Sequence, residues 1–256
     1  MNDICAGTII SIRDLHKRFG QQVVLDGVDL DIAACESLVI LGRSGCGKSV
    51  LLKHITGLIS PDSGSVFFLG EDITKFNRQK LFEMRVHFGM LFQGAALFDS
   101  MTVGENVGLP LVKHGKKSDE EIREIVFEKL RLIGLTGVYD SYPSQLSGGM
   151  KKRVGLARAI VMDPKVVLYD EPTTGLDPIM ADVINSLIRD LQRELDITSV
   201  VVTHDIQSAN RVADRITMLH EGRIIFSGTP QETRETDNGI VRQFIEGRAD
   251  GPVQAV

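Results

Sequence analysis

A glycine-rich stretch of eight residues, Gly42–Ser49, carries the strongest chemical signal in the chain. It reads GRSGCGKS, with its glycines, lysine and serine at the spacing of a phosphate-binding loop. Backbone N–H groups in such a loop turn toward phosphate oxygens, and the following helix adds its positive N-terminal end. Lys48 suits the β- and γ-phosphates, and Ser49 suits Mg²⁺. The predicted nucleotide contacts are Gly42, Arg43, Ser44, Gly45, Cys46, Gly47, Lys48, Ser49 and Val50.

Two adjacent acids follow an apolar run that is typical of a buried strand. Asp170 and Glu171 come directly after Val166–Tyr169. In open α/β sheets, ligands lie at the carboxyl ends of the strands, where paired carboxylates have no structural use. Asp170 fits a carboxylate associated with Mg²⁺, and Glu171 fits the group that orients and polarises an attacking water. The alternative is that both acids only solvate the strand end.

A short glycine motif, LSGGM at Leu146–Met150, precedes a predicted helix. Ser147 is an adequate N-cap, so the motif can be an ordinary turn into that helix. The same geometry also makes a phosphate site, because the Ser147 hydroxyl and the amides of Gly148 and Gly149 lie at a helix N-terminus. The phosphate-binding loop upstream and the acidic pair downstream favour the second interpretation.

The composition is that of an ordinary globular protein, with 256 residues, 43% of them hydrophobic and 25% charged. A net charge of −5 gives no general attraction for nucleic acid. No apolar run approaches the roughly 18 residues of a membrane helix, and the N-terminus has no signal-peptide core. Cys5, Cys35 and Cys46 are too few and too scattered for a disulfide framework or a zinc site. We therefore expect a reduced, cytosolic chain whose link to a membrane comes through a partner.

Periodicity and turn residues predict the elements that position these groups. The expected strands are Thr8–Arg13, Val23–Leu25, Val28–Ile32, Leu38–Leu41 directly before the phosphate-binding loop, Ser65–Leu69, Val86–Phe92, Val166–Tyr169, Ser199–Val202, Asp214–Leu219 and Arg223–Phe226, with a turn over Leu15–Gln22. The expected helices are one after the phosphate-binding loop, Gln79–Arg85, one from Ser118 to Gly134, one after the LSGG motif, Ile179–Leu195, Gln207–Val212 and one capped by Thr229. Ser118 with Glu121 forms a capping box, and the last residues, 248–256, read as a tail.

Taken together, these motifs resemble those of the ATP-binding cassette (ABC) ATPases. The resemblance covers nearly everything from Ile9 to about Gly228 and includes, in order, the phosphate-binding loop, Gln93, the signature LSGGM, the acidic pair, Gly175-Leu176-Asp177 and His204. It implies an α/β P-loop NTPase fold with a RecA-like core, an N-terminal antiparallel β subdomain and an inserted α-helical subdomain. We expect a single domain over 1–256, with 1–93 and 162–228 as core and β subdomain, 94–161 as helical subdomain, and 229–256 as C-terminal helix and tail.

The family resemblance also implies a mechanism. Two cassettes would close head to tail on two ATP molecules, each held between one chain's phosphate-binding loop and the other chain's Ser147, Gly148 and Gly149. Phe19 would stack on adenine, and Gln93 would contact Mg²⁺ and the water. His204 would hold the γ-phosphate, and Asp177 would run along the dimer seam. With Glu171, the implied catalytic residues are Gln93 and His204, and the implied metal ligands are Ser49, Gln93 and Asp170.

Three longer sequence segments resemble those of one subfamily, the ATPases of Mla-type (Mce-associated) phospholipid transporters of Gram-negative bacteria. These segments are LFQGAALFDSMTVGENV, LSGGMKKRVGLARAI and LYDEPTTGLDPI. The resemblance implies a homodimer on the cytoplasmic face of the inner membrane, bound to two permeases, a periplasmic Mce-type lipid-binding protein and in some systems a small STAS-domain protein. It implies phospholipid movement between the inner and outer membranes that maintains outer-membrane lipid asymmetry. Nucleic acid is not an expected partner.

Two sequence features and two other functions leave alternatives open. The signature has Met150 where the family usually has glutamine, and a thioether cannot replace the hydrogen bonds of an amide. The basic run Lys151–Arg153 could attract phosphates or acidic lipid headgroups, but it is most simply a solvated helix face. The motor of a small-solute importer, such as one for amino acids, would share every catalytic residue. A soluble ABC protein that remodels nucleic acid or ribosomes is a further alternative, but the chain lacks the second cassette or basic surface usual there.

Overall fold

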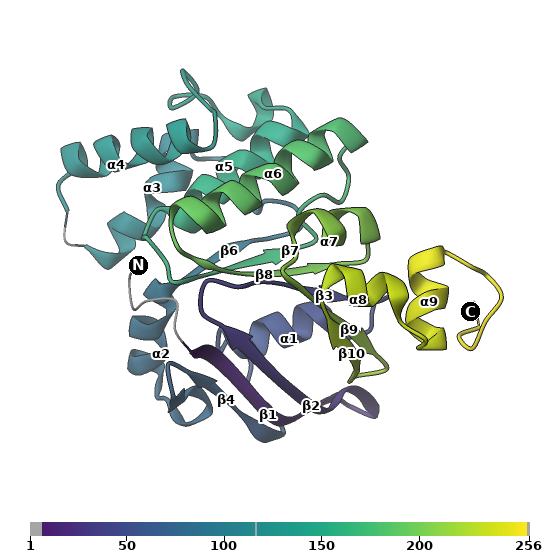
Figure 1. The fold of residues 1–256 in the computed structure, drawn as a ribbon. Helices are drawn as coiled ribbons and strands as arrows, with labels where there is room; N and C mark the ends of the chain where they lie inside the picture. The colour runs from purple at the N-terminus through teal and green to yellow at the C-terminus, as the bar shows by residue number, and fades with distance from the viewer. Residues whose placement is uncertain (1–6, 116, 255–256) are drawn as a thin grey trace. The chain divides into compact units, whose positions relative to one another are not determined.

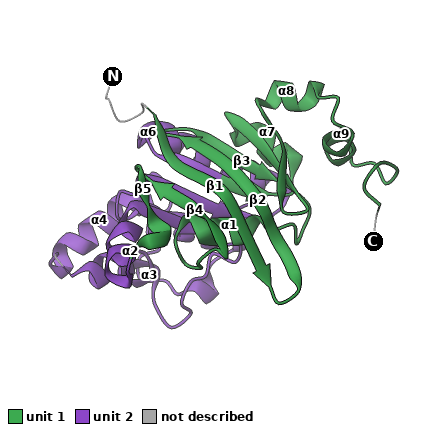
Figure 2. Ribbon diagram, turned by 90° about the horizontal axis from the view of Figure 1, so that it is seen from below, with its two compact units in different colours: residues 1–76, 201–256 green, residues 77–200 purple. Residues whose placement is uncertain are grey.

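The computed structural model describes residues 7–115 and 117–254. The chain forms two compact units, which Figure 2 shows in different colours. Unit 1 comprises Met1–Phe76 and Val201–Val256, and unit 2 comprises Asn77–Val200. The phosphate-binding loop belongs to unit 1, and the acidic pair and the signature belong to unit 2.

Unit 1 contains a four-stranded antiparallel sheet in the order β2-β1-β4-β5 (Figure 1). Its strands are β1 (Thr8–Phe19), β2 (Gln22–Ala33), β4 (Ser63–Phe68) and β5 (Glu71–Asp72). The predicted turn over Leu15–Gln22 is wrong, because β1 continues to Phe19 and the chain reverses at Gly20, whose φ is +59°. Likewise, the two short strands expected between Val23 and Ile32 are one strand. The long hairpin therefore carries Phe19 to its tip.

The six-stranded sheet has the order β10-β9-β3-β8-β7-β6, and the boundary between the units falls within β8 (Thr198–Thr203). In unit 1, β3 (Ser37–Leu41) pairs in parallel with β9 (Arg215–His220), which forms a hairpin with β10 (Arg223–Gly228). All five residues of β3 are buried, as expected of a central parallel strand. Helix α1 (Lys48–Ile55) follows β3 through the phosphate-binding loop, and α7 (Ile206–Val212) follows β8.

The C-terminal part of unit 1 contains two short helices, α8 (Pro230–Glu235) and α9 (Gly239–Glu246). Thr229 caps α8, as the sequence predicts, and also forms a capping box with Glu232, while Asn238 caps α9. Helix α9 ends at Gly247, whose φ of +64° fits a glycine. The described residues after Gly247 form bends rather than a helix or strand, so the predicted tail is confirmed as far as Gln254.

In unit 2, β6 (Phe88–Leu91) pairs in parallel with β7 (Val166–Asp170). The helices are α2 (Arg78–Met84), α3 (Val103–His114), α4 (Asp119–Leu132), α5 (Gly148–Ile160) and α6 (Pro178–Glu194). Helices α3 and α4 both contact α5, which also packs on β6. Because α5 is surrounded, most of its residues are buried. Helix α5 is therefore the central helix of this unit.

Helix α3 is absent from the sequence prediction, although its start has a clear signal. Thr102 and Glu105 form a capping box there, while Pro110 inside the helix obscures the pattern. Asn106 is fully buried, and its amide donates to the carbonyls of Phe98 and Met101 at 3.0 and 3.1 Å. Helix α3 therefore holds the preceding loop in place. The capping box predicted for α4 from Ser118 and Glu121 is confirmed.

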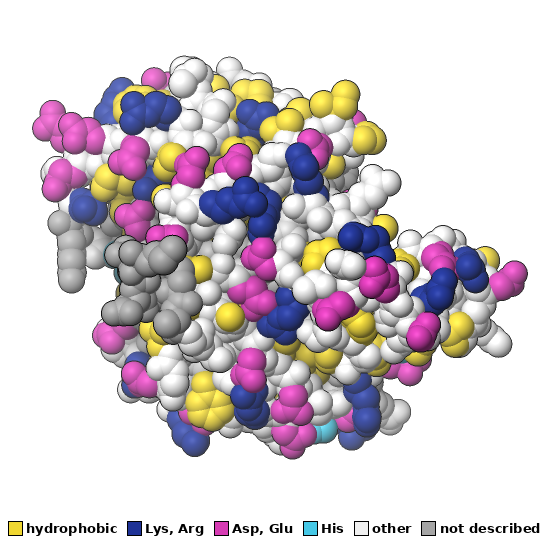
Figure 3. Space-filling view, in the orientation of Figure 1, with side chains coloured by type: hydrophobic (Ala, Val, Ile, Leu, Met, Phe, Trp, Pro, Cys, Tyr) yellow, Lys and Arg dark blue, Asp and Glu magenta, His cyan; other side chains and the backbone are white. Residues whose placement is uncertain are grey.

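No helix among the described residues has the length and apolar character needed to cross a membrane. Acidic and basic side chains are interspersed over the face that Figure 3 shows. Cys46 forms no disulfide, Cys35 is disulfide-bonded, and Cys5 lies outside the described residues. The expectation that all the cysteines are reduced is therefore wrong at Cys35.

Candidate functional site

The phosphate-binding loop leaves β3 and enters α1 through backbone conformations that require glycine. Gly45 and Gly47 have φ of +80° and +107°. Gly42 has no room for a side chain, because a Cβ would lie 2.4 Å from the Leu219 carbonyl oxygen. Gly47 is also the N-cap of α1, and no acidic residue lies in the first turn of that helix. The loop therefore presents a positive helix end without a competing side-chain carboxylate.

Lys48 is buried at the first position of α1, with 6% of its surface exposed. Its ammonium donates to the carbonyl oxygens of Gly42 at 2.7 Å and Arg43 at 3.0 Å. These contacts hold the side chain across the loop that it serves. Charge-assisted hydrogen bonds of this kind can be exchanged for stronger ones to a phosphate.

Phe19 lies at the tip of the long hairpin and is 51% exposed. The Lys17 ammonium lies 5.5 Å from the centre of the Phe19 ring and donates to Asp62 at 2.8 Å and to the Ser60 carbonyl at 2.9 Å. The hydrogen bond from Lys17 holds the pKa of Asp62 below its ordinary value. The backbone beside Phe19 is thus tied down while the ring stays open for stacking.

His204 is exposed and follows the end of β8 in unit 1. A hollow of about 690 Å³ borders the phosphate-binding loop in the same unit. Its lining includes loop residues Arg43–Cys46, strand residues Gln22–Val24, the turn His220–Gly222 and tail residues Pro252–Gln254. The Arg43 guanidinium donates to the Gln254 carbonyl at 3.3 Å, so the tail reaches the phosphate-binding loop.

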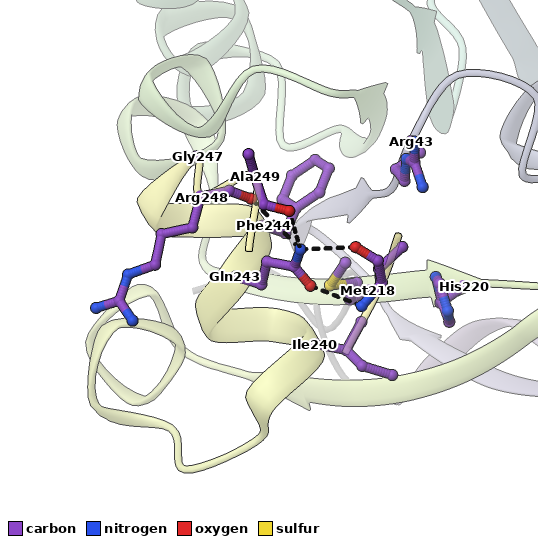
Figure 4. A pocket seen from close by; sticks show the side chains of 10 residues that line it. Arg43, Met218, His220, Ile240, Gln243, Phe244, Gly247, Arg248 and Ala249 are labelled. Atoms are coloured by element: carbon purple, nitrogen blue, oxygen red, sulfur yellow. Dashed lines mark hydrogen bonds between the residues drawn. The ribbon is translucent and has the colours of Figure 1, made fainter. Parts of the chain in front are cut away.

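The tail is also held by Gln243 of α9, as Figure 4 shows. Its amide donates to the Val253 carbonyl at 2.8 Å, and its Oε1 accepts from the Val253 N–H at 2.8 Å. A cavity of about 220 Å³ lies between α9, this segment and β9. It is lined by Arg43, Met218, His220, Ile240, Gln243, Phe244, Gly247, Arg248, Ala249 and Val253. Sequence reasoning left the position of this tail open.

In unit 2, Asp170 ends β7 and Glu171 follows it, both half-buried. Glu171 has a φ of +48°, which is uncommon for a residue with a side chain. Its carboxylate accepts a hydrogen bond from the Thr174 hydroxyl at 3.1 Å, and its carbonyl accepts from the Thr174 N–H at 3.3 Å. Glu171 is therefore held at both its backbone and its side chain, as expected of a group that must be oriented.

Lys152 contradicts the prediction that Lys151–Arg153 is a solvated helix face. Its side chain is buried, with 5% of its surface exposed, and its ammonium donates to the carbonyls of Gln93 and Glu171. Burial lowers the pKa of the Lys152 ammonium, and the negative charges of Glu171 and Asp170 oppose that shift. Gln93 itself is exposed just beyond β6. Lys152 thus brings Gln93 and Glu171 together, and sequence reasoning did not place it in the site.

Ser147 of the signature motif is the helix N-cap that the sequence predicts. Ser147 is the exposed N-cap of α5, and its hydroxyl accepts from the Met150 N–H at 3.3 Å. Gly148 is exposed, whereas Gly149 is buried against Met180, whose Cε would lie 2.4 Å from an added Cβ. A helix N-terminus with a serine hydroxyl and exposed backbone can receive a phosphate. Met150 contributes only its backbone N–H among the hydrogen bonds described.

Asp177 is exposed and caps α6, accepting from the N–H groups of Ile179 and Met180, both at 3.0 Å. This local contact accounts for an aspartate directly before Pro178 without any ligand. Its neighbour Ile179 is 77% exposed. The structure therefore assigns Asp177 a structural role, and a role along a dimer seam stays a prediction.

The residues fit ATP and Mg²⁺ on their chemistry. Lys48 and the N-terminus of α1 supply the positive groups that a triphosphate needs. The Ser49 hydroxyl and the Asp170 carboxylate supply oxygen donors, which Mg²⁺ prefers. No group of three or more His, Cys, Asp or Glu side chains that could hold a metal occurs among the described residues. Mg²⁺ needs no such cage, because it takes one or two protein ligands together with substrate phosphates and water.

Comparisons with known proteins identify the family to which the chain belongs. The model of the ABC transporter family matches residues 25–174. Among solved structures, a protein from Clostridium perfringens that is part of an ABC transporter complex matches with a TM-score of 0.83 at 32% identity, covering 95% of this chain and 96% of that one. A dimeric ATP-binding cassette in a post-hydrolysis state, bound to ADP and phosphate, matches with a TM-score of 0.80 at 33% identity, covering 86% and 98%.

Curated relatives extend over 96% of this chain. A probable ribonucleotide transport ATP-binding protein of Mycobacterium leprae is 44% identical, with 71% of its own length covered. The ATP-binding protein of an intermembrane phospholipid transport system is 39% identical in Haemophilus influenzae, with 93% covered, and 38% identical in Escherichia coli, with 91% covered. The fold expected from the sequence is confirmed, and the chain belongs to the ABC transporter family as an ATP-binding and ATP-hydrolysing cassette.

Proposed function

We propose that this chain is the ATP-hydrolysing subunit of a transporter that moves phospholipids between two membranes. The observation that carries the ATPase activity is the phosphate-binding loop, with Lys48 buried across it at the N-terminus of α1. The substrate class rests on the relatives named for intermembrane phospholipid transport, which match over nearly the full length of both chains. We infer that the system maintains the lipid asymmetry of an outer membrane.

Within this proposal each residue has a defined task. Gly42–Val50 and Phe19 bind the triphosphate and the adenine, and Ser49, Gln93 and Asp170 hold Mg²⁺, which neutralises phosphate charge. Glu171 accepts a hydrogen bond from the attacking water and orients it toward the γ-phosphate. His204 donates to the γ-phosphate. Residues 94–161 form the helical subdomain, whose signature motif binds the nucleotide of the partner cassette.

We further propose that the active unit is a homodimer, in which Ser147, Gly148 and Gly149 complete the nucleotide site of the other chain and Asp177 lies along the seam. Dimeric cassettes occur among the solved neighbours. Replacing Ser147 with arginine places a bulky cation on the exposed N-cap of α5. Ser147→Arg is expected to abolish steady-state ATPase activity and to leave ATP binding by the separate chain intact, as measured by equilibrium titration.

The matched control for this prediction is Ser118→Arg, which makes the same replacement at the N-cap of α4. Each variant loses a helix cap, so both carry a stability cost of about 1 kcal/mol. Only Ser147 belongs to the proposed interface. Equal ATPase losses in the two variants would show that the effect is general destabilisation and would contradict the dimer proposal.

The proposed complex contains two copies of this chain on the cytoplasmic face of an inner membrane, bound to two permease subunits. A periplasmic Mce-type lipid-binding protein and a small STAS-domain protein complete it. The tagged chain, purified from its native membrane in mild detergent, should retain a permease, the Mce-type protein and phospholipid, identified by mass spectrometry. A permease with a solute-binding protein and no retained lipid would favour a small-solute importer. Recovery of ribosomal or nucleic-acid partners alone would exclude the transport function.

A further inference from the structure

Helix α5 carries a buried cation, Lys152, which has no role in the proposed function. Lys152 is 5% exposed, and its ammonium reaches two backbone carbonyls from different parts of unit 2, that of Gln93 after β6 and that of Glu171 after β7. The distance to the Glu171 carbonyl is 3.2 Å. A buried ammonium is costly unless its donors are satisfied, so these contacts are what make its position tolerable.

The packing of α5 explains why Lys152 reaches both segments. Lys152, Gly155, Leu156 and Ala159 are buried at the three- and four-residue spacing of one helix face. At Gly155 an added Cβ would lie 2.8 Å from Leu91 and 3.2 Å from Ala95. The absence of a side chain there lets the end of β6 and the following loop approach the helix closely.

A second cation on α5 holds the same loop further along. Arg158 donates to the carbonyl oxygens of Ala95 at 2.6 Å and Ala96 at 2.7 Å. Ala95 and Ala96 have φ of +60° and +47°, a left-handed conformation that costs free energy in residues with a Cβ. The loop from Gln93 to Ala96 is therefore fixed to α5 at both ends.

At its other contact, Lys152 supports a backbone that is itself unusual. Glu171 has a φ of +48°, and its carbonyl also accepts from the Thr174 N–H at 3.3 Å. The orientation of this peptide group determines where the Glu171 side chain leaves the main chain. The Thr174 hydroxyl then holds the carboxylate at 3.1 Å.

From these contacts we infer that Lys152 is a positioning residue for ATP hydrolysis, which links the backbone of Gln93 to the backbone of Glu171 through one ammonium group. The inference rests on the proposed function, in which those two side chains handle Mg²⁺ and the attacking water. Lys152 touches neither nucleotide nor water. It acts by keeping the Gln93 loop and Glu171 in register, and small misplacements of catalytic groups can cost roughly 10²-fold in rate.

The first test compares Lys152→Met with Lys151→Met in the full chain purified with its membrane partners. Methionine has nearly the length of lysine but no N–H donors, and Lys151 is a half-buried neighbour outside the proposed site. Lys152→Met is expected to lower kcat for ATP about 10- to 100-fold and to change KM and the Kd for ATP less than about threefold. Lys151→Met should match the unchanged chain. Unchanged kcat, or a loss confined to KM, would overturn the inference.

Lys152→Gln is the conservative variant, because its shorter amide keeps two N–H donors. It should retain more activity than Lys152→Met, and it decides the test if Lys152→Met does not fold. A kcat for a folded Lys152→Gln equal to or below that of a folded Lys152→Met would overturn a role that depends on hydrogen-bond donation. The shorter glutamine side chain is not expected to bridge the carbonyls of Gln93 and Glu171 at once, so its kcat should still lie below that of the unchanged chain. If Lys152→Met does not fold, unchanged kcat in Lys152→Gln would therefore overturn the inference.

A double-variant cycle separates positioning from general packing. If Lys152 acts through Glu171, adding Lys152→Met to Glu171→Gln should slow the residual hydrolysis by a smaller factor than it slows the unchanged chain, because one of the two groups that Lys152 positions is already lost. Independent, multiplicative losses would show that Lys152 acts elsewhere and would overturn the inference. Failure of Glu171→Gln itself to slow hydrolysis would instead refute the proposed function, so the two failures are distinguishable.

Discussion

Replacing Glu171 with glutamine is expected to slow ATP hydrolysis roughly 10²- to 10⁴-fold while ATP binding is retained, which is the usual contribution of a positioned general base. The substitution is nearly isosteric. The glutamine Oε1 can still accept the hydrogen bond that the Thr174 hydroxyl now gives to the Glu171 carboxylate at 3.1 Å. The backbone contact from Lys152 is also unaffected. What disappears is the negative charge that would polarise the water.

The measurement is a single-turnover rate with bound ATP, together with an equilibrium titration of ATP. Glu194→Gln, at the exposed end of α6 in the same unit, makes the same chemical change away from the proposed site and should leave both values unchanged. Turnover of Glu171→Gln near that of the unchanged chain would mean that another group orients the water.

Replacing Lys48 with alanine is expected to impair nucleotide binding itself. The ammonium now bonds to the carbonyls of Gly42 and Arg43, and in the complex it would bond to phosphate oxygens. Loss of two charge-assisted hydrogen bonds, at about 1.5 kcal/mol each or more, corresponds to a rise in Kd of at least about 10²-fold. Calorimetric titration with ATP would measure it.

Lys53→Ala provides the control for this prediction, because Lys53 is an exposed residue of the same helix. It changes the charge of α1 equally but lies outside the phosphate-binding loop. An equal loss of affinity in both variants would indicate a general electrostatic effect of α1. Unchanged affinity in Lys48→Ala would remove Lys48 from the binding site.

The phosphate-binding loop is predictable from sequence because all its parts are local. Its glycines, Lys48 and Ser49 lie within eight residues, and the structure confirms the strand before them and the helix after them. The caps of α4 and α8 are predictable for the same reason, since each capping box spans four residues. Local chemistry of this kind needs no knowledge of the tertiary fold.

Contacts between distant segments are harder to predict. Lys152 lies in a basic run that is typical of a solvated face, and its burial follows only from the packing of α3, α4 and β6 around α5. The sequence does hold one indication of this burial, because Lys152 shares a helix face with Gly155, Leu156 and Ala159. The position of the C-terminal tail could not be predicted from sequence for a similar reason. It depends on hydrogen bonds between the Gln243 side chain and the backbone of Val253.

The tip of the β1–β2 hairpin was mispredicted for a different reason. The polar run around Lys17 and Arg18 reads as a turn, yet β1 extends to Phe19 because the strand pairs with β2 along its whole length. Hydrogen bonds to Asp62 from Lys17 and from the Arg18 N–H then hold the end of the strand. Pairing between the two strands of the hairpin has overridden local composition here.

The central claim, that ATP hydrolysis by this chain drives phospholipid movement, is tested most directly by transfer assays on the reconstituted complex. Fluorescent phospholipid transfer and uptake of labelled ribonucleotide would be measured in the same vesicles, with and without ATP. The account predicts ATP-dependent phospholipid transfer that is lost with Glu171→Gln, and no ribonucleotide uptake. ATP-dependent uptake of ribonucleotide without lipid transfer would contradict it.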